Sequence, residues 1–167
     1  MGKQVMRAAA ALVALVLMMW PAAIGAIEQR PMPAFRVVTS DGAPVDSAQL
    51  SSEVQFLVVY VGANCRPCDA MLESLKGWAS PALIARTVVI VRGGAPAATD
   101  YMQRQLPQEL QGIKWYADPD NAAAKALKLQ GAPVIIGVKT GVITWSISGV
   151  LSDPPALQSV VRSWVEY

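Results

Sequence analysis

The pair Cys65 and Cys68 stands where this chain changes from a strand pattern to a helix pattern. Before the pair, the run Gln55–Val61 is nearly all apolar and rich in β-branched residues, which is typical of a strand covered on both faces. After it, Pro67 falls in the first turn of the expected helix, where its missing N–H costs nothing. Apolar residues then recur on one helical face, at Cys68, Met71, Leu72, Leu75 and Trp78. The sequence therefore predicts a buried strand that leads into a helix beginning beside Cys65.

The rest of the chain alternates between strand and helix patterns. Further strands are expected at Phe35–Val38, Thr87–Val91 and Ile113–Ala117, and a late hairpin joins Val134–Val138 to Val142–Ile147. Helices are expected at residues 97–106, ended by Pro107, at Asp118–Leu129, with Asp118 as N-cap, and from Leu157 to Val165. This order favours an α/β fold, with parallel strand pairs covered on both faces and a late hairpin that makes the sheet mixed.

The chain has two cysteines, which are separated by two residues. Three roles other than redox chemistry fit this pair poorly. A disulfide across so short a loop stabilises by only about 2 kcal/mol at best, so a structural staple is weak. Structural zinc takes four ligands, and the chain has no histidine and no third cysteine. Haem attachment needs a histidine after the second cysteine, where Asp69 stands. The spacing therefore favours a redox-active pair.

The two cysteines are expected to play different parts. Cys65 lies at the start of the helix, where unpaired N–H groups favour a negative charge, so we expect it to be the attacking thiolate. Cys68 faces the same way as Leu72 and should be the buried partner that resolves a mixed disulfide. Arg66 and Pro67 lie between them and are candidates for modulating the pair, although a solvated surface role suits Arg66 equally well.

The first 26 residues read as a secretory signal. Lys3 and Arg7 precede an uncharged apolar run, and cleavage after Ala26 fits the small residues there. The alternative is an uncleaved membrane anchor, because the uncharged run just reaches the length of a span. Residues 27–34 are expected to be a linker and residues 35–167 the folded domain. Without the leader, twelve basic residues face twelve acidic ones, and this neutral balance argues against nucleic-acid binding.

Two groups of motifs resemble known proteins. A strand, a Cys-x-x-Cys pair that opens a helix, and Gly131-Ala132-Pro133 before a late hairpin resemble thioredoxin. Pro33-Ala34-Phe35, the turn Asp41–Val45, Leu50 and the run Phe56–Cys68 resemble the TlpA-like branch of that superfamily, and the likeness covers roughly residues 31–167. The resemblance implies a three-layer thioredoxin-like fold with a mixed central sheet, helices on both faces and an N-terminal β-hairpin extension. TlpA-like proteins are exported thiol–disulfide oxidoreductases, so it also implies a periplasmic location.

The resemblance assigns further roles. Ala132 and Pro133 would form the family's cis-proline loop, which packs against the redox pair and offers backbone to the substrate peptide. The alternative is that Pro133 merely starts a strand. Protein disulfides are the implied substrates and a membrane protein the implied electron donor. No cofactor and no metal are expected, and contact with the membrane is expected only through an uncleaved leader.

Two departures from thioredoxin keep other functions open. Asn64 replaces the Trp before the first cysteine, and Val59 replaces a buried Asp that can shuttle a proton. Glu73 lies on the expected helix but is expected to be solvated, and no role is assigned to it. A non-catalytic assembly or binding subunit of an envelope complex, with a vestigial pair, is therefore an alternative. Copper(I) delivery through two thiolates is another, although the mature chain has neither histidine nor a methionine cluster to support it.

Overall fold

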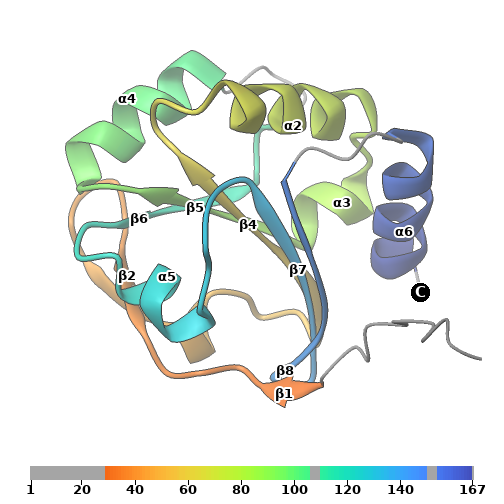
Figure 1. Ribbon diagram of the computed structural model, residues 1–167, viewed down its shortest axis with the longest axis horizontal. Coiled ribbons are helices and arrows are strands. Elements are labelled where there is room, and N and C mark those ends of the chain that lie inside the picture. The colour runs from red at the N-terminus through yellow and green to blue at the C-terminus, as the bar shows by residue number, and fades with distance from the viewer. Residues whose placement is uncertain (1–28, 106–109, 150–153, 167) are drawn as a thin grey trace, which may run out of the picture.

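The computed structural model describes residues 29–105, 110–149 and 154–166 of the chain. Within them, an eight-stranded sheet in the order β1-β8-β7-β4-β5-β6-β2-β3 forms the centre of the molecule (Figure 1). The predicted leader and the predicted end of a helix at Pro107 lie outside the described residues.

The strands are β1 (Arg30–Pro31), β2 (Arg36–Val38), β3 (Pro44–Asp46), β4 (Gln55–Gly62), β5 (Thr87–Arg92), β6 (Lys114–Asp118), β7 (Val134–Lys139) and β8 (Val142–Ser148). The helices are α2 (Arg66–Gly77), α3 (Pro81–Ala85), α4 (Ala95–Gln105), α5 (Ala122–Leu127) and α6 (Pro154–Glu166), with a 3-10 turn η1 at Ser47–Gln49. β4 runs parallel to β5, and β5 runs parallel to β6, whereas β7 is antiparallel to both β4 and β8. The mixed sheet and the late hairpin predicted from the sequence are confirmed.

β4 shows why the sheet needs cover on both faces. Leu57, Val59 and Val61 point to the face that α2, α3, α4 and α6 cover. Val58 and Tyr60 point to the opposite face, where α5 and the segment around Phe35 pack. Side chains alternate along a strand, so a continuous apolar run fills both layers at once. The result is three layers, with helices on both faces of the sheet as predicted.

The N-terminal hairpin extends the sheet at one edge. β2 and β3 pair antiparallel around a turn at residues 39–43, and Gly42 there has a φ of +86°, which glycine adopts without strain. The Thr39 hydroxyl donates to the carboxylate of Asp41, and this bond holds the pKa of that carboxyl below its ordinary value. A bridge from Val38 to Ala117 joins the hairpin to β6.

The segment predicted as a linker contains a short strand. Arg30 and Pro31 form β1, which pairs with Ile143 and Val142 of β8. A proline is tolerated there because β1 is an edge strand and needs no second set of N–H donors. The Arg30 Nη2 donates to the carbonyl oxygen of Leu127 at 2.7 Å, which ties this edge to the end of α5.

The predicted helix Asp118–Leu129 is wrong at its start. Asp118 is the last residue of β6, and no helix begins at the next residue. α5 begins only at Ala122. Asn121, with a φ of +54°, stands immediately before the helix. The carboxylate of Asp118 still accepts hydrogen bonds from the N–H groups of Ala123 and Ala124, each at 3.1 Å. It therefore caps the helix from the end of the preceding strand.

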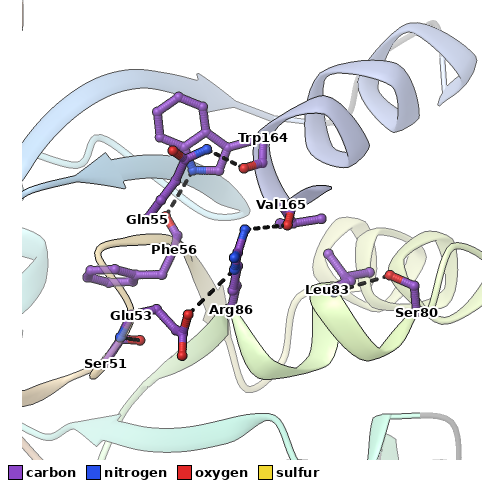
Figure 2. A network of polar contacts seen from close by, with 9 residues as sticks. All are labelled: Ser51, Glu53, Gln55, Phe56, Ser80, Leu83, Arg86, Trp164 and Val165. Atoms are coloured by element: carbon purple, nitrogen blue, oxygen red, sulfur yellow. Dashed lines mark hydrogen bonds and ion pairs between the residues drawn. The ribbon is translucent and has the colours of Figure 1, made fainter. Parts of the chain in front are cut away.

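A short helix, α3, went unpredicted. It begins at Pro81 behind the N-cap Ser80, whose hydroxyl oxygen accepts from the N–H of Leu83 at 3.2 Å (Figure 2). Its five residues are too few for a clear helical period.

The C-terminal helix α6 is tied to the sheet by polar contacts as well as by its apolar face (Figure 2). The Trp164 Nε1 donates to the Phe56 carbonyl at 3.2 Å, and the Gln55 amide donates to the Trp164 carbonyl. The Arg86 Nη1 donates to the Val165 carbonyl at 2.6 Å. Carbonyls in the last turn of a helix lack intrahelical partners, so Gln55 and Arg86 satisfy them.

Candidate redox site

Cys65 caps the N-terminus of α2. Its backbone is extended, with φ −132° and ψ 92°, and its Sγ lies 3.2 Å from the N–H of Cys68, which donates to it. A side-chain acceptor at this position satisfies one of the free N–H groups of the first turn. Gly62 lies close by, and a Cβ there would stand 3.3 Å from the Cβ of Cys65. Cys65 is therefore half-buried, with its sulfur at a helix N-terminus, where negative charge is favoured.

Cys68 differs from Cys65 in its burial. It is 0% exposed, and its Sγ accepts from the N–H of Gly62 at 3.3 Å. The two sulfurs form a disulfide with an S–S distance of 2.07 Å and a Cα–Cα distance of 5.1 Å. The pair is thus in its oxidised form, and it joins a half-buried cysteine to a fully buried one.

The loop before β7 meets the redox pair. The Ala132–Pro133 peptide bond is cis, and the Ala132 carbonyl oxygen lies 3.7 Å from the Cys65 Sγ. The disulfide carries no proton, but a reduced Cys65 thiol can donate to this carbonyl. The Pro133 carbonyl accepts from the N–H of Gly149 at 2.8 Å, which fixes the loop to the end of β8. Residues 65 and 132, far apart in the sequence, are therefore brought together as the resemblance implies.

Helix α4 flanks the site through contacts that the sequence analysis missed. The buried Tyr101 hydroxyl donates to the Asp69 Oδ1 at 2.8 Å, which joins α4 to α2 one residue after Cys68. Burial, and then the hydrogen bond to Asp69, raise the pKa of Tyr101 above its ordinary value. Arg104 lies 5.8 Å from the centre of the Tyr101 ring, and its Nη2 lies 3.5 Å from the Ala63 carbonyl. No local pattern in the sequence predicts the bond from Tyr101 to Asp69, because it spans 32 residues.

The other residues singled out from the sequence lie at the rim or away from the pair. Arg66 and Pro67 are exposed, and their modulating role stays a prediction. Glu73 is exposed and lies 3.7 Å from the Lys76 ammonium. Val59 is 0% exposed on the α2 face, so an apolar side chain occupies the strand position considered for a buried acid.

A buried acid does exist, but its hydrogen bonds lie on the α5 side. Asp118 is 0% exposed, and its carboxylate accepts from the Tyr60 hydroxyl at 3.0 Å as well as from two N–H groups of α5. Tyr60 points away from the face that contains Cys68. Asp118 therefore stabilises the packing of α5 against the sheet and does not contact the redox pair.

Solved structures of similar shape show what kind of fold this is. A secreted Mycobacterium tuberculosis disulfide oxidoreductase homologous to E. coli DsbE is 18% identical, with a TM-score of 0.60 over 77% of this chain and 95% of that chain. A thiol:disulfide interchange protein of the thioredoxin family from Chlorobium tepidum is 24% identical, with a TM-score of 0.56 over 83% and 97%. A thio-disulfide isomerase from Thermus thermophilus is 19% identical, with a TM-score of 0.62 over 83% and 97%. The chain has a thioredoxin-like fold.

No protein-family model matches the sequence, and no curated protein does either. In its thioredoxin-like fold and its bonded Cys65–Cys68 pair, the chain resembles thiol–disulfide oxidoreductases. Within the described residues, no helix is both long enough and apolar enough to cross a bilayer. No group of three or more acidic, cysteine or histidine side chains forms a metal site in that part of the chain.

Proposed function

We propose that this protein is an extracytoplasmic thiol–disulfide oxidoreductase that reduces disulfides in other proteins. The supporting observation is the unequal position of the two sulfurs: Cys65 is half-buried at a helix N-terminus, and Cys68 is fully buried. A structural staple needs no such asymmetry. An exchange reaction does, because one sulfur must meet the substrate and the other must remain in reserve.

The reaction starts from the reduced pair. The Cys65 thiolate attacks one sulfur of the substrate disulfide, a Cys65–substrate disulfide forms, and the other substrate sulfur leaves as a thiolate that takes up a proton. The Cys68 thiolate then attacks the Cys65 sulfur, which restores the Cys65–Cys68 disulfide and releases the second substrate thiolate. Two electrons pass from the pair to the substrate. We assign their return to a membrane electron donor.

The arrangement around Cys65 supports these steps. The Cys68 N–H donates to the Cys65 Sγ, and the Gly62 N–H donates to the Cys68 Sγ, so each sulfur has a backbone donor that favours its thiolate. We assign the Ala132 carbonyl and Pro133 to binding the substrate backbone beside Cys65, since that carbonyl lies 3.7 Å from its sulfur.

An extracytoplasmic location is part of the same proposal. The basic start and apolar run of the first 26 residues favour export, and one similar structure is of a protein described as secreted. An oxidising compartment is also where protein disulfides persist as substrates. A fusion of residues 1–40 to a reporter that is active only in the periplasm tests this location, and an inactive fusion retained in the cytosol contradicts it.

The activity is tested by insulin reduction with purified residues 27–167 and a chemical reductant. We expect the domain to accelerate insulin precipitation and Cys68→Ser to accumulate mixed disulfides, seen as higher bands on a non-reducing gel. Cys65→Ser should trap far fewer, because its remaining thiol is buried. If partners instead co-purify equally well with both cysteines replaced by serine, the protein is a binding subunit and the enzymatic proposal fails.

A further inference from the structure

A cavity of about 420 Å³ lies on the α5 face of the sheet, behind the loop that meets Cys65. Its apolar floor comes from β7 and β8, through Val134, Ile136 and Ile143. Ser146 and Ser148 of β8 add hydroxyls to the lining. The cavity therefore offers both apolar surface and hydrogen-bonding groups.

The charged groups that line the cavity all have one sign. Arg30 enters from β1 and Lys128 from the end of α5, and the described lining contains no carboxylate. One terminal nitrogen of Arg30 donates to the Leu127 carbonyl at 2.7 Å. A guanidinium has five N–H donors, so this bond leaves others for a ligand. Two cations beside apolar surface suit a group that carries a carboxylate next to an apolar part.

A single loop lies between the cavity and the redox site. Ala132 and Pro133 line it, and the Ala132 carbonyl lies 3.7 Å from the Cys65 Sγ. Ala132 also packs against the apolar clusters on both faces of the sheet. A polypeptide whose cysteine meets Cys65 therefore needs to cross only this loop to place a neighbouring side chain in the cavity.

We propose that this cavity is a specificity site for substrate polypeptides with an acidic residue near the reacting cysteine. The inference rests on the proposed function, since it names which protein disulfides the pair prefers. Arg30 and Lys128 attract the carboxylate, and the floor of β7 and β8 receives the apolar part of the same segment. A neutral substrate still reacts, but without this attraction.

Matched synthetic peptides test the proposal. Each peptide contains one cysteine as its thiopyridyl mixed disulfide and one glutamate at a position one to six residues before or after it. The control peptide has glutamine at the same position. Attack by the reduced protein forms a Cys65–peptide disulfide and releases thiopyridone, whose absorbance gives the second-order rate. At the best position we expect glutamate to react about fivefold faster than glutamine, the size of a partly exposed ion pair, and added salt to reduce that ratio.

A matched pair of variants locates the effect. Lys128→Glu should abolish or invert the preference for glutamate, whereas Lys139→Glu should keep it, since Lys139 is also exposed but does not line the cavity. Both variants change the net charge equally. Lys128 has a φ of +57°, so Lys128→Asn gives a neutral replacement suited to that backbone, and it should lower the preference without inverting it.

The outcomes separate this inference from the proposed function. Equal rates for glutamate and glutamine peptides at every position, with thiopyridone released from all of them, would overturn the specificity site and leave the oxidoreductase proposal standing. An equal preference in Lys128→Glu and in the unchanged protein would also overturn it. If no peptide releases thiopyridone while dithiothreitol releases it from all of them, the proposed function itself fails.

Discussion

Two helices of this protein begin at the same edge of the sheet, and their first turns are capped in different ways. β4 leads into α2 and β6 leads into α5, and both strands run parallel to β5. At α2 the acceptor is the Cys65 sulfur, with one N–H donor from Cys68. At α5 it is the Asp118 carboxylate, with two N–H donors and the Tyr60 hydroxyl.

The difference shows what separates a reactive cap from a structural one. The Asp118 carboxylate is fully buried and accepts three hydrogen bonds, so it has little left with which to bind or react. Cys65 is half-buried, and the charge of its sulfur depends on the redox state of the pair. The same helix-end electrostatics thus stabilise a permanent contact in one place and a transient thiolate in the other.

The largest expected effect is on turnover. Cys65→Ser should lower insulin reduction to the rate without protein, because the attacking sulfur is gone, while serine still caps α2. Asp118→Asn should keep its turnover per folded molecule, because Asp118 binds groups on the α5 face. Insulin reduction, scaled by the folded fraction from circular dichroism, measures both. Equal loss in the two variants would remove the distinction between the caps.

The next effect is a difference in labelling. In the reduced protein, iodoacetamide at neutral pH should modify Cys65 and leave Cys68 unmodified, because Cys68 is 0% exposed. Peptide mapping after a short exposure identifies the labelled residue. Labelling in denaturant, where both react, is the control. Faster labelling of Cys68 would reverse the roles of the two cysteines.

The stability of the protein should depend strongly on Asp118. Asp118→Ala leaves two N–H groups of α5 and the Tyr60 hydroxyl without their acceptor, and we expect the free energy of unfolding to fall by about 3 kcal/mol. Tyr60→Phe removes one donor and should cost about 1 kcal/mol. Urea unfolding measures both changes. A smaller loss in Asp118→Ala than in Cys65→Ser would mean that the buried cap is not the stronger one.

The smallest effect concerns alkaline pH. Burial, and then the charge of Asp118, raise the pKa of Tyr60 above its ordinary value of 10.0. Above that pH the unfolded chain releases the Tyr60 proton while the folded protein keeps it, so the free energy of unfolding should fall as pH rises. Tyr60→Phe should make this decline less steep. Urea unfolding between about pH 9 and pH 11 measures this decline. If the free energy of unfolding falls equally steeply in Tyr60→Phe and in the unchanged protein, the raised pKa of Tyr60 is not its cause.

Patterns local in the sequence were enough to predict most of the architecture. The apolar run of β4 and the helical spacing after Cys65 predict their elements, because burial on two faces or on one stripe leaves a short-range signature. The Asp41-Gly42 dipeptide between two apolar runs also predicts the N-terminal hairpin, because glycine adopts the positive φ that such a turn needs. The thioredoxin-like arrangement of these elements came from the resemblance.

Features that depend on distant residues were missed. The strand at Arg30 needs β8 and the end of α5, and its hydrogen bond spans 97 residues of sequence. Asp118 also accepts a hydrogen bond from Tyr60, 58 residues away, and its local pattern predicts only the capping of a helix. The bond from Tyr101 to Asp69 spans 32 residues. No local period records such contacts, because each exists only once the chain has folded.

Helix α6 also completes one face of the sheet. α6 supplies Leu157, Val161 and Val165 to the larger apolar cluster, and its Trp164 stacks edge-on against Trp145 with ring centres 5.5 Å apart. A Cβ at residue 137 would overlap the Trp145 indole, so the packing of that ring requires a glycine there. Without α6, this side of the sheet lacks part of its cover. A fragment that stops before residue 154 would therefore expose the apolar residues that α6 covers.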